Sequence, residues 1–378
     1  MSAGPPFAFS LETEISFGVG VRSKVGEAAR RFGQRVAVVA GEHAFLRSPF
    51  RAEIEAALRH SQVEIVVTCP SMGEPTLEET IATGAAIRLA RAEVVVAVGG
   101  GSVLDLAKAA AIAALEGMDL GALAAGQRFD STALPVIALP TTAGSGAEVS
   151  RGAIVLDEAA GNKRGIRGAG VAPRVALVDP QLVVSCPRSV SAMAGFDAVA
   201  HAVETSLSRA ATPITQLLSV EALRHLLSEV PRSLDYPDDL RSRSSASYGA
   251  LLMGINLANS TTCLPHRMQY PVGALTRTEH ALGVAALTRA WLWRSLEFAP
   301  DRVARLAPAI GDDVSDAASV VEAILNFMST LDLRPRLRDL GVRRDQLGRL
   351  TEMVEGAVEN DPGPSDRAAI LELYEASY

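Results

Sequence analysis

The chain has 378 residues, 48% of them hydrophobic and 21% charged, a globular composition long enough for two domains with sizeable cores. Its net charge is −7 at pH 7 and its Lys and Arg residues are scattered, which argues against a basic surface for nucleic acid or for an anionic membrane. We therefore expect a small-molecule partner.

The cysteines and the N-terminal segment predict a cytoplasmic protein. Cys69, Cys186 and Cys263 lie far apart and form neither a disulfide framework nor a CxxC metal motif, so we expect them to be small buried side chains in a reducing compartment. The N-terminal residues show no basic region followed by an apolar run. No uncharged apolar stretch approaches the length that spans a bilayer, so we expect no membrane partner.

Between Ile15 and about Leu139, short β-branched runs alternate with Ala-, Leu- and Glu-rich segments of helical spacing. The predicted strands cover 35–40, 63–68, 93–99 and 135–139. Strands that alternate with helices predict a parallel sheet covered on both faces, and such sheets bind ligands beyond the carboxyl ends of their strands.

The β-rich pattern ends after VALVDP at 175–180, and Pro187 introduces long segments of helical period that continue to Tyr378. This change predicts an α/β dinucleotide-binding domain at 1–188 and an all-helical domain at 189–378. Within the helical part, we interpret 308–316 and 359–366 as polar loops.

A glycine turn directly follows the strand at 93–99. It consists of Gly99, Gly100, Gly101 and Ser102, and a helical segment begins at once after it. Glycine allows close backbone approach, and the free N–H groups of a helix start attract an anion such as a pyrophosphate. Ser102 and Asp105 also resemble a helix-capping pair. A turn without a ligand has the same composition, so this motif alone leaves both interpretations open.

A second loop rich in hydroxyls and glycines follows the strand at 135–139, with Thr141, Thr142 and Ser145 as its main polar side chains. Hydroxyls and exposed amides suit a ribose or a phosphate, and two such loops at neighbouring strand ends would form one dinucleotide groove. A solvated turn remains the alternative.

One carboxylate and three imidazoles in the helical part predict a metal site. Asp197 and His201 are four residues apart, which places both on one face of a helix. His266 and His280 follow, and Pro271 with Gly273 makes one continuous helix through both unlikely to form, so we expect His266 near the start of one helix and His280 near the start of the next.

Three nitrogens and one oxygen suit Zn²⁺ or Fe²⁺ better than Mg²⁺ or Ca²⁺. The alternative is a salt-bridged helix pair of Asp197 and His201 with two unrelated histidines. The other histidines, His43, His60 and His225, are interpreted as surface or core residues.

Five segments together resemble the iron-containing (group III) alcohol dehydrogenase family. They are GGGSVLDLAK, LPTTAGSGAEVSRGAI, VDPQLV, GFDAVAHAVE and the segment from His266 to His280, in the family's order along nearly the whole chain. The resemblance implies a Rossmann-like N-terminal domain and an all-α C-terminal domain of the dehydroquinate synthase-like type. It also implies a nicotinamide coenzyme, Fe²⁺ or Zn²⁺, and a homodimer or larger oligomer.

The resemblance carries over residue by residue. The family's four metal ligands match Asp197, His201, His266 and His280. Its pyrophosphate turn matches Gly99, Gly100, Gly101 and Ser102, and its second coenzyme loop matches Thr141, Thr142 and Ser145. Asp105 and Lys163 fall on positions that the family uses near the coenzyme.

The sequence departs from the family pattern at three positions. Tyr270 replaces a second histidine that often follows the third ligand, and Ala281 replaces a glycine after the last ligand. Gly41 stands where NAD-preferring members often place an aspartate that holds the adenosine ribose. The loss of that carboxylate favours NADP over NAD, although the neighbouring Glu42 could supply the same repulsion.

The resemblance implies hydride transfer between nicotinamide C4 and an alcohol or carbonyl bound to the metal, as in an alcohol dehydrogenase or aldehyde reductase. The alternatives are a polyol dehydrogenase or a maleylacetate reductase of the same superfamily, or a catalytically silent nucleotide-binding homologue. We expect substrate-pocket walls from Tyr270, Met253, Asn256, Asn259 and Arg277, the last as a possible partner of a carboxylate or phosphonate.

Overall fold

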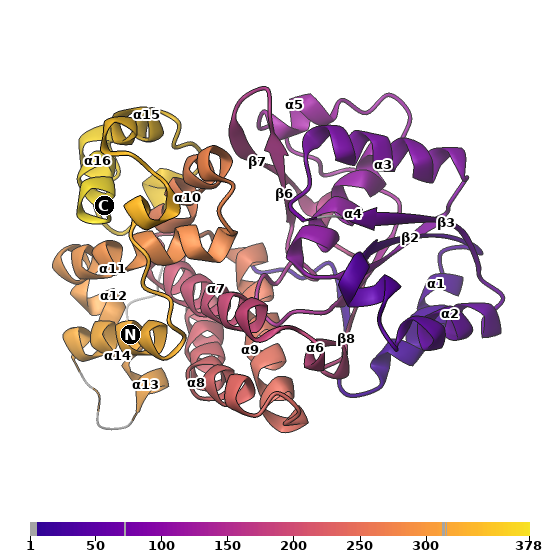
Figure 1. The fold of residues 1–378 in the computed structure, drawn as a ribbon, viewed down its shortest axis with the longest axis horizontal. Helices are drawn as coiled ribbons and strands as arrows, with labels where there is room; N and C mark the ends of the chain where they lie inside the picture. Colours follow the sequence, from indigo (N-terminus) through magenta and orange to yellow (C-terminus); the bar gives the residue numbers. More distant parts are fainter. Residues whose placement is uncertain (1–5, 72, 312–313, 315) are drawn as a thin grey trace.

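The computed structural model describes residues 6–378 apart from 72, 312, 313 and 315, in two halves that differ in secondary structure (Figure 1). The first half contains strands and helices, and every element described after β8 is helical. The strands are β1 (Glu14–Phe17), β2 (Arg35–Gly41), β3 (Glu64–Ser71), β4 (Val94–Gly99), β5 (Val136–Pro140), β6 (Gly152–Asp157), β7 (Asn162–Arg167) and β8 (Val175–Val178).

The main sheet confirms the expected architecture. Its strand order is β1-β8-β5-β4-β2-β3, and every neighbouring pair is parallel. Alternate side chains of each strand enter different cores: Val38 packs with α1 (Val25–Arg30) and α2 (Arg51–His60), whereas Val39 packs with α3 (Leu77–Leu89) and α4 (Gly101–Ala113). Both faces are therefore covered, which explains the nearly continuous apolar runs of β2 and β4.

A separate antiparallel hairpin of β6 and β7 lies beside this sheet. The apolar run of β6 is evident in the sequence, but β7 reads Asn-Lys-Arg-Gly-Ile-Arg, which lacks a strand-like apolar pattern. Ala153, Val155 and Ile166 pack against α5 (Leu120–Ala124) and fix the hairpin in place. Its position decides where Lys163 and Arg167 lie.

The helical half encloses its own core, in which Phe196, Trp291 and Tyr374 are fully buried. Its helices follow α6 (Gln181–Val184) and are α7 (Arg188–Leu207), α8 (Pro213–Asp235), α9 (Leu240–Asn259), α10 (Leu264–Thr276), α11 (His280–Phe298), α12 (Pro300–Ala304), α13 (Ala307–Ile310), α14 (Ala317–Thr330), α15 (Leu347–Glu352) and α16 (Arg367–Ala376). Figure 1 shows α7 running along the side of this half that faces the sheet domain.

Some local expectations differ from the structure. The break between the two histidine-bearing helices lies after Thr276, where Arg277 adopts φ 56°, and α10 continues through Pro271. The stretch expected as a loop at 308–316 begins within α13, and 358–360 forms a 3₁₀ turn within the second expected loop region. Short elements of three or four residues have too few periodic positions to be recognised from sequence.

Among the described residues, no helix is both long and apolar enough to cross a bilayer.

Candidate active site

Three helices bring the four predicted metal ligands together. α7 places Asp197 and His201 one turn apart, so that His201 Nδ1 lies 3.7 Å from Asp197 Oδ2. His266 in the first turn of α10 and His280 at the start of α11 direct their Nε2 atoms towards Asp197 Oδ1, at 3.4 Å and 3.6 Å. The rings of His201 and His266 are stacked, with their centroids 4.3 Å apart.

The cluster fits a divalent cation. Asp197 Oδ1, His201 Nδ1 and His266 Nε2 are buried and lack a hydrogen-bond partner, which is costly unless something else satisfies them. The potential ligand atoms of Asp197, His201 and His266 all lie within 4.8 Å of one another. Three imidazole nitrogens and one carboxylate oxygen form the donor set that Zn²⁺ or Fe²⁺ accepts.

Two residues that the sequence analysis missed orient the imidazoles. The buried Glu204 carboxylate lies 2.6 Å from His266 Nδ1, and Gln269 Oε1 lies 2.8 Å from His280 Nδ1. Such partners fix the ring so that Nε2 is presented to a metal. A signal for Glu204 was available, because it follows Asp197 by seven residues and His201 by three, and therefore shares their helix face.

Burial keeps two of the histidines in the neutral form that can bind a metal. Burial, only partly offset by Asp197, lowers the pKa of His201 to about 4 and that of His280 to about 3. Burial opposes charge on His266 too, but Glu204 and Asp197 raise the pKa of His266 to about 10. Burial likewise opposes ionisation of Asp197, yet the surrounding imidazoles hold its pKa well below the usual range.

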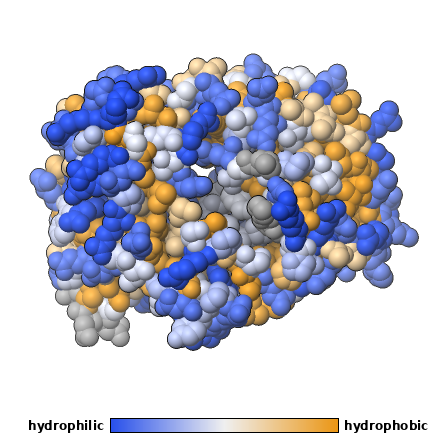
Figure 2. Space-filling view, viewed as in Figure 1, coloured by the Kyte–Doolittle hydropathy of each residue, from blue (hydrophilic) through white to orange (hydrophobic). Residues whose placement is uncertain are grey.

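The metal-ligand cluster opens into a cleft of about 1210 Å³ between the two halves. Figure 2 shows the surface hollowed between the halves. α4 begins at the edge of this cleft with Gly100 as its N-cap and no side-chain cap, so its first N–H groups stay free for an anion. A Cβ on Gly101 would meet Ser145 Oγ at 2.7 Å, so the two predicted coenzyme loops touch at this glycine.

Most of the residues expected at the site line this one cleft. They are Gly41, Gly100, Gly101, Ser102, Asp105, Thr142, Ser145, Lys163, Asp197, His201, His266, Tyr270 and His280. Gly99 and Thr141 do not belong to the described lining, because they sit at the ends of β4 and β5, where the Thr141 N–H donates to the Gly99 carbonyl at 3.0 Å. This hydrogen bond joins the strand ends from which the two loops begin.

Asp105 does not cap α4, contrary to the expectation for its pairing with Ser102. Its Oδ2 accepts the Ile154 N–H at 2.9 Å, and its Oδ1 lies 2.9 Å from Nζ of the buried Lys108. The carboxylate therefore connects α4 to β6.

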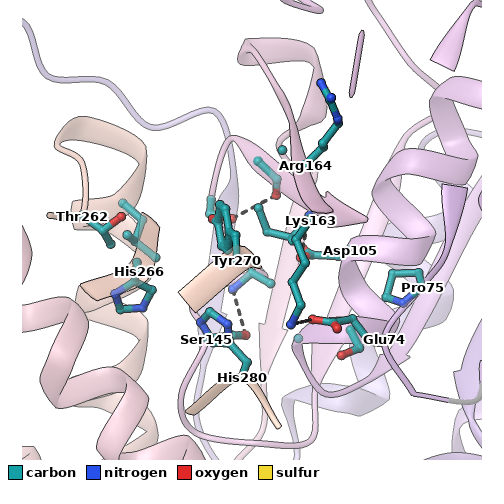
Figure 3. A pocket seen from close by; sticks show the side chains of 18 of the residues that line it. Glu74, Pro75, Asp105, Ser145, Lys163, Arg164, Thr262, His266, Tyr270 and His280 are labelled. Carbon is teal, nitrogen blue, oxygen red and sulfur yellow. Dashed lines mark hydrogen bonds and ion pairs between the residues drawn. The ribbon is translucent and has the colours of Figure 1, made fainter. Parts of the chain in front are cut away.

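Figure 3 shows Lys163 pointing towards Glu74, and the Lys163 Nζ lies 2.6 Å from Glu74 Oε1.

The adenosine end of the cleft is expected at the carboxyl end of β2. Gly41 and Glu42 both belong to the lining there. Glu42 Oε1 lies 2.5 Å from a guanidinium nitrogen of Arg47, so its charge is compensated by a nearby cation.

The wall beside the metal-ligand cluster differs from the expected one. Tyr270 lies in the cleft as predicted, and although burial would raise the pKa of its phenol, Arg267 and Arg167 lower that pKa below its usual range. The other expected wall residues lie elsewhere: Met253 and Asn256 are buried among the helices, Asn259 bonds to Ser10, and Arg277 is exposed.

The family models match both halves of the chain. The model described as iron-containing alcohol dehydrogenase matches residues 12–180, and the model described as the C-terminal part of the Fe-containing alcohol dehydrogenase family matches residues 191–378. With the fold and the metal-ligand cluster, these matches define a metal-dependent oxidoreductase that acts on alcohols. The chain belongs to the iron-containing alcohol dehydrogenase family, which confirms the resemblance noted in its motifs.

Individual relatives match the chain over nearly its whole length. A probable alcohol dehydrogenase, EutG, of Salmonella typhimurium is 27% identical over 98% of this chain and 94% of its own. A choline dehydrogenase of Bacillus subtilis is 28% identical over 91% of this chain and 88% of its own. The crystal structure of a sulfoacetaldehyde reductase from Bifidobacterium kashiwanohense in complex with NAD⁺ has the same fold, with a TM-score of 0.88 at 24% identity over 99% of both chains.

Proposed function

We propose that this protein is a nicotinamide-linked alcohol dehydrogenase or aldehyde reductase whose cation, Fe²⁺ or Zn²⁺, is held by Asp197, His201, His266 and His280. One observation carries the proposal: the metal-ligand cluster and the glycine-rich turn at the start of α4 line the same cleft. Metal and coenzyme sites that share a cleft can serve one substrate. We assign the coenzyme to a domain at 1–188 and the metal to a domain at 189–378, with α7 at the boundary.

A bound cation supplies Lewis-acid stabilisation of negative charge on a reacting alcohol or carbonyl oxygen, and a nicotinamide coenzyme gives or takes the hydride. The residues of the chain orient the metal ligands and hold the coenzyme. Glu204 and Gln269 hold the His266 and His280 rings, and the free N–H groups at Gly101 and Ser102 suit the pyrophosphate. Tyr270 shapes the wall of the reacting region, and its phenol need not transfer the proton.

For the coenzyme we propose NADP(H). Gly41 brings no carboxylate to the end of β2, and the Glu42 carboxylate beside it is paired with Arg47, which reduces its repulsion of a 2′-phosphate. Purified enzyme should use NADPH with a higher kcat/KM than NADH. Replacing Arg47→Gln should lower that preference by about tenfold, the effect of one interaction worth about 1.4 kcal/mol. Arg59→Gln, on the exposed surface of α2, is the matched control.

The experiment for the whole proposal measures metal content and coenzyme oxidation with small aldehydes before and after chelation. We expect near-stoichiometric iron or zinc and loss of turnover on chelation. His201→Asn should lose both metal and activity, whereas His225→Asn, which alters a histidine bonded to Ser245 away from the cleft, should keep both. Metal-free protein that oxidises neither coenzyme, even after reconstitution, would instead support a silent nucleotide-binding homologue.

Two further expectations complete the proposal. The three cysteines are free, which supports a reducing, cytoplasmic location. A homodimer or larger oligomer is what the family resemblance implies, and the molar mass of the purified protein by light scattering tests it.

A further inference from the structure

Two of the basic side chains that line the cleft have no ion-pair partner among the described residues. Four of its basic side chains, Arg128, Arg151, Lys163 and Arg164, each lie within 4.0 Å of a carboxylate oxygen. Arg167 and Arg267 also line the cleft, but no carboxylate in the described part of the chain lies within that distance of either guanidinium. Arg167 is exposed to solvent, so the buried Arg267 is the one of the two whose charge most needs a partner.

Arg267 gives the stronger indication of an anion site, because its side chain is only 3% exposed. It follows the metal ligand candidate His266 in α10, its guanidinium donates to Thr261 Oγ1 at 2.8 Å, and its buried Nε has no hydrogen-bond partner. Burying a charge without an ion-pair partner is energetically costly. An anion bound in the cleft would compensate this charge and could accept hydrogen bonds from the guanidinium.

Arg167 lines the same cleft as Arg267, but it belongs to the other half of the molecule. It lies on β7 and is exposed, whereas Arg267 lies on α10, and both side chains line the cleft that also contains Tyr270. The Arg267 Cζ is 5.9 Å from the centre of the Tyr270 ring. Two guanidinium groups that line one cleft repel each other less when an anion lies between them, and planar guanidinium groups recognise oxyanions well.

We propose that the substrate of this enzyme carries an oxyanion group, such as a carboxylate, which binds to Arg267 and Arg167 beside Tyr270. This inference rests on the proposed function, since the alcohol or aldehyde carbon of the same molecule would react at the neighbouring metal-ligand cluster. Arg277, the arginine that the sequence suggested for this role, is exposed and lies 2.8 Å from Glu158. Glu279 in the lining has no ion-pair partner among the described residues, but it is exposed, so its charge carries little desolvation cost.

The test compares two aldehydes of similar size on the metal-loaded enzyme, the anion 4-oxobutanoate and neutral butanal. We expect kcat/KM for 4-oxobutanoate to exceed that for butanal by tenfold to a hundredfold. Arg267→Gln should reduce this ratio to near one, chiefly by raising KM for 4-oxobutanoate, and Arg267→Lys should restore part of it. Arg277→Gln, a matched change outside the cleft, should keep the ratio of the unmodified enzyme.

A second measurement needs no variant and so does not depend on whether the altered proteins fold. Succinate should inhibit butanal reduction competitively, and neutral succinamide should not. A ratio near or below one, together with no inhibition by succinate, would overturn the oxyanion site while leaving the dehydrogenase intact. An equal fall in kcat/KM for both aldehydes in Arg267→Gln would show a merely structural arginine. If neither aldehyde is reduced at all, the proposed function itself fails.

Discussion

Replacing Glu204→Gln should weaken metal binding without changing any proposed metal ligand. The Glu204 carboxylate accepts a hydrogen bond from the Cys263 N–H at 2.8 Å and lies 2.6 Å from His266 Nδ1. Glutamine has the same shape but removes the negative charge that favours a donating Nδ1–H. The His266 ring then loses the partner that presents its Nε2 to the cation.

The expected loss is tenfold to a hundredfold in metal affinity, or about 1.4–2.7 kcal/mol, because the hydrogen-bond partner of a metal-bound imidazole typically contributes this much. Both proteins would be titrated with Zn²⁺ against a chelator of known affinity, and the bound metal would be measured after gel filtration. The melting temperature of the metal-free form would be recorded as well, to separate local from global damage.

A similar carboxylate and imidazole pair provides the control. On α8, Glu221 Oε1 lies 3.4 Å from His225 Nε2, and neither residue belongs to the lining of the cleft. Glu221→Gln should therefore bind metal like the unmodified protein. Unchanged Zn²⁺ affinity in Glu204→Gln would refute the idea that Glu204 orients a ligand, and equal losses in both variants would point to a general effect of removing charge.

Three more predictions follow from the structure. Burial raises the pKa of Glu148 to about 7, so the folded protein keeps a proton that the unfolded chain releases from about pH 4.5 upward, and the free energy of unfolding should fall between these two pH values. The free energy of unfolding of Glu148→Gln, measured in urea, should exceed that of the unmodified protein by up to about 3 kcal/mol more at pH 8 than at pH 4. An equal difference at both pH values would contradict this prediction. Tyr270→Phe should keep every ionisation in the pH–rate profile and stay within about tenfold in kcat/KM, and a lost ionisation would make the phenol a proton carrier. Gly101→Ala should raise the coenzyme KM by about tenfold, since its Cβ would meet Ser145 Oγ, whereas Gly348→Ala enters open space and should leave that KM unchanged.

The local pattern of the chain was enough to predict the two-domain architecture. β2 and β4 are buried on both faces, so their apolar runs are nearly continuous and easily recognised. The hairpin strand β7 was missed because its side chains are mostly polar and its pairing with β6 is the main evidence for it. Two separate histidine-bearing helices were correctly expected, but the break between them lies at Arg277, because Pro271 is tolerated within α10.

The sequence likewise predicted one part of the candidate site, and tertiary packing decided the other part. The spacing of Asp197 and His201 on one helix was determined by the sequence, because the helical repeat places residues four apart on one face. Their approach to His266 and His280 depends on the packing of α7, α10 and α11, which no local pattern encodes. Packing also decided that Arg267, rather than Arg277, faces the cleft. Short-range periodicity determines which side chains share a face, and only tertiary contacts determine which faces meet.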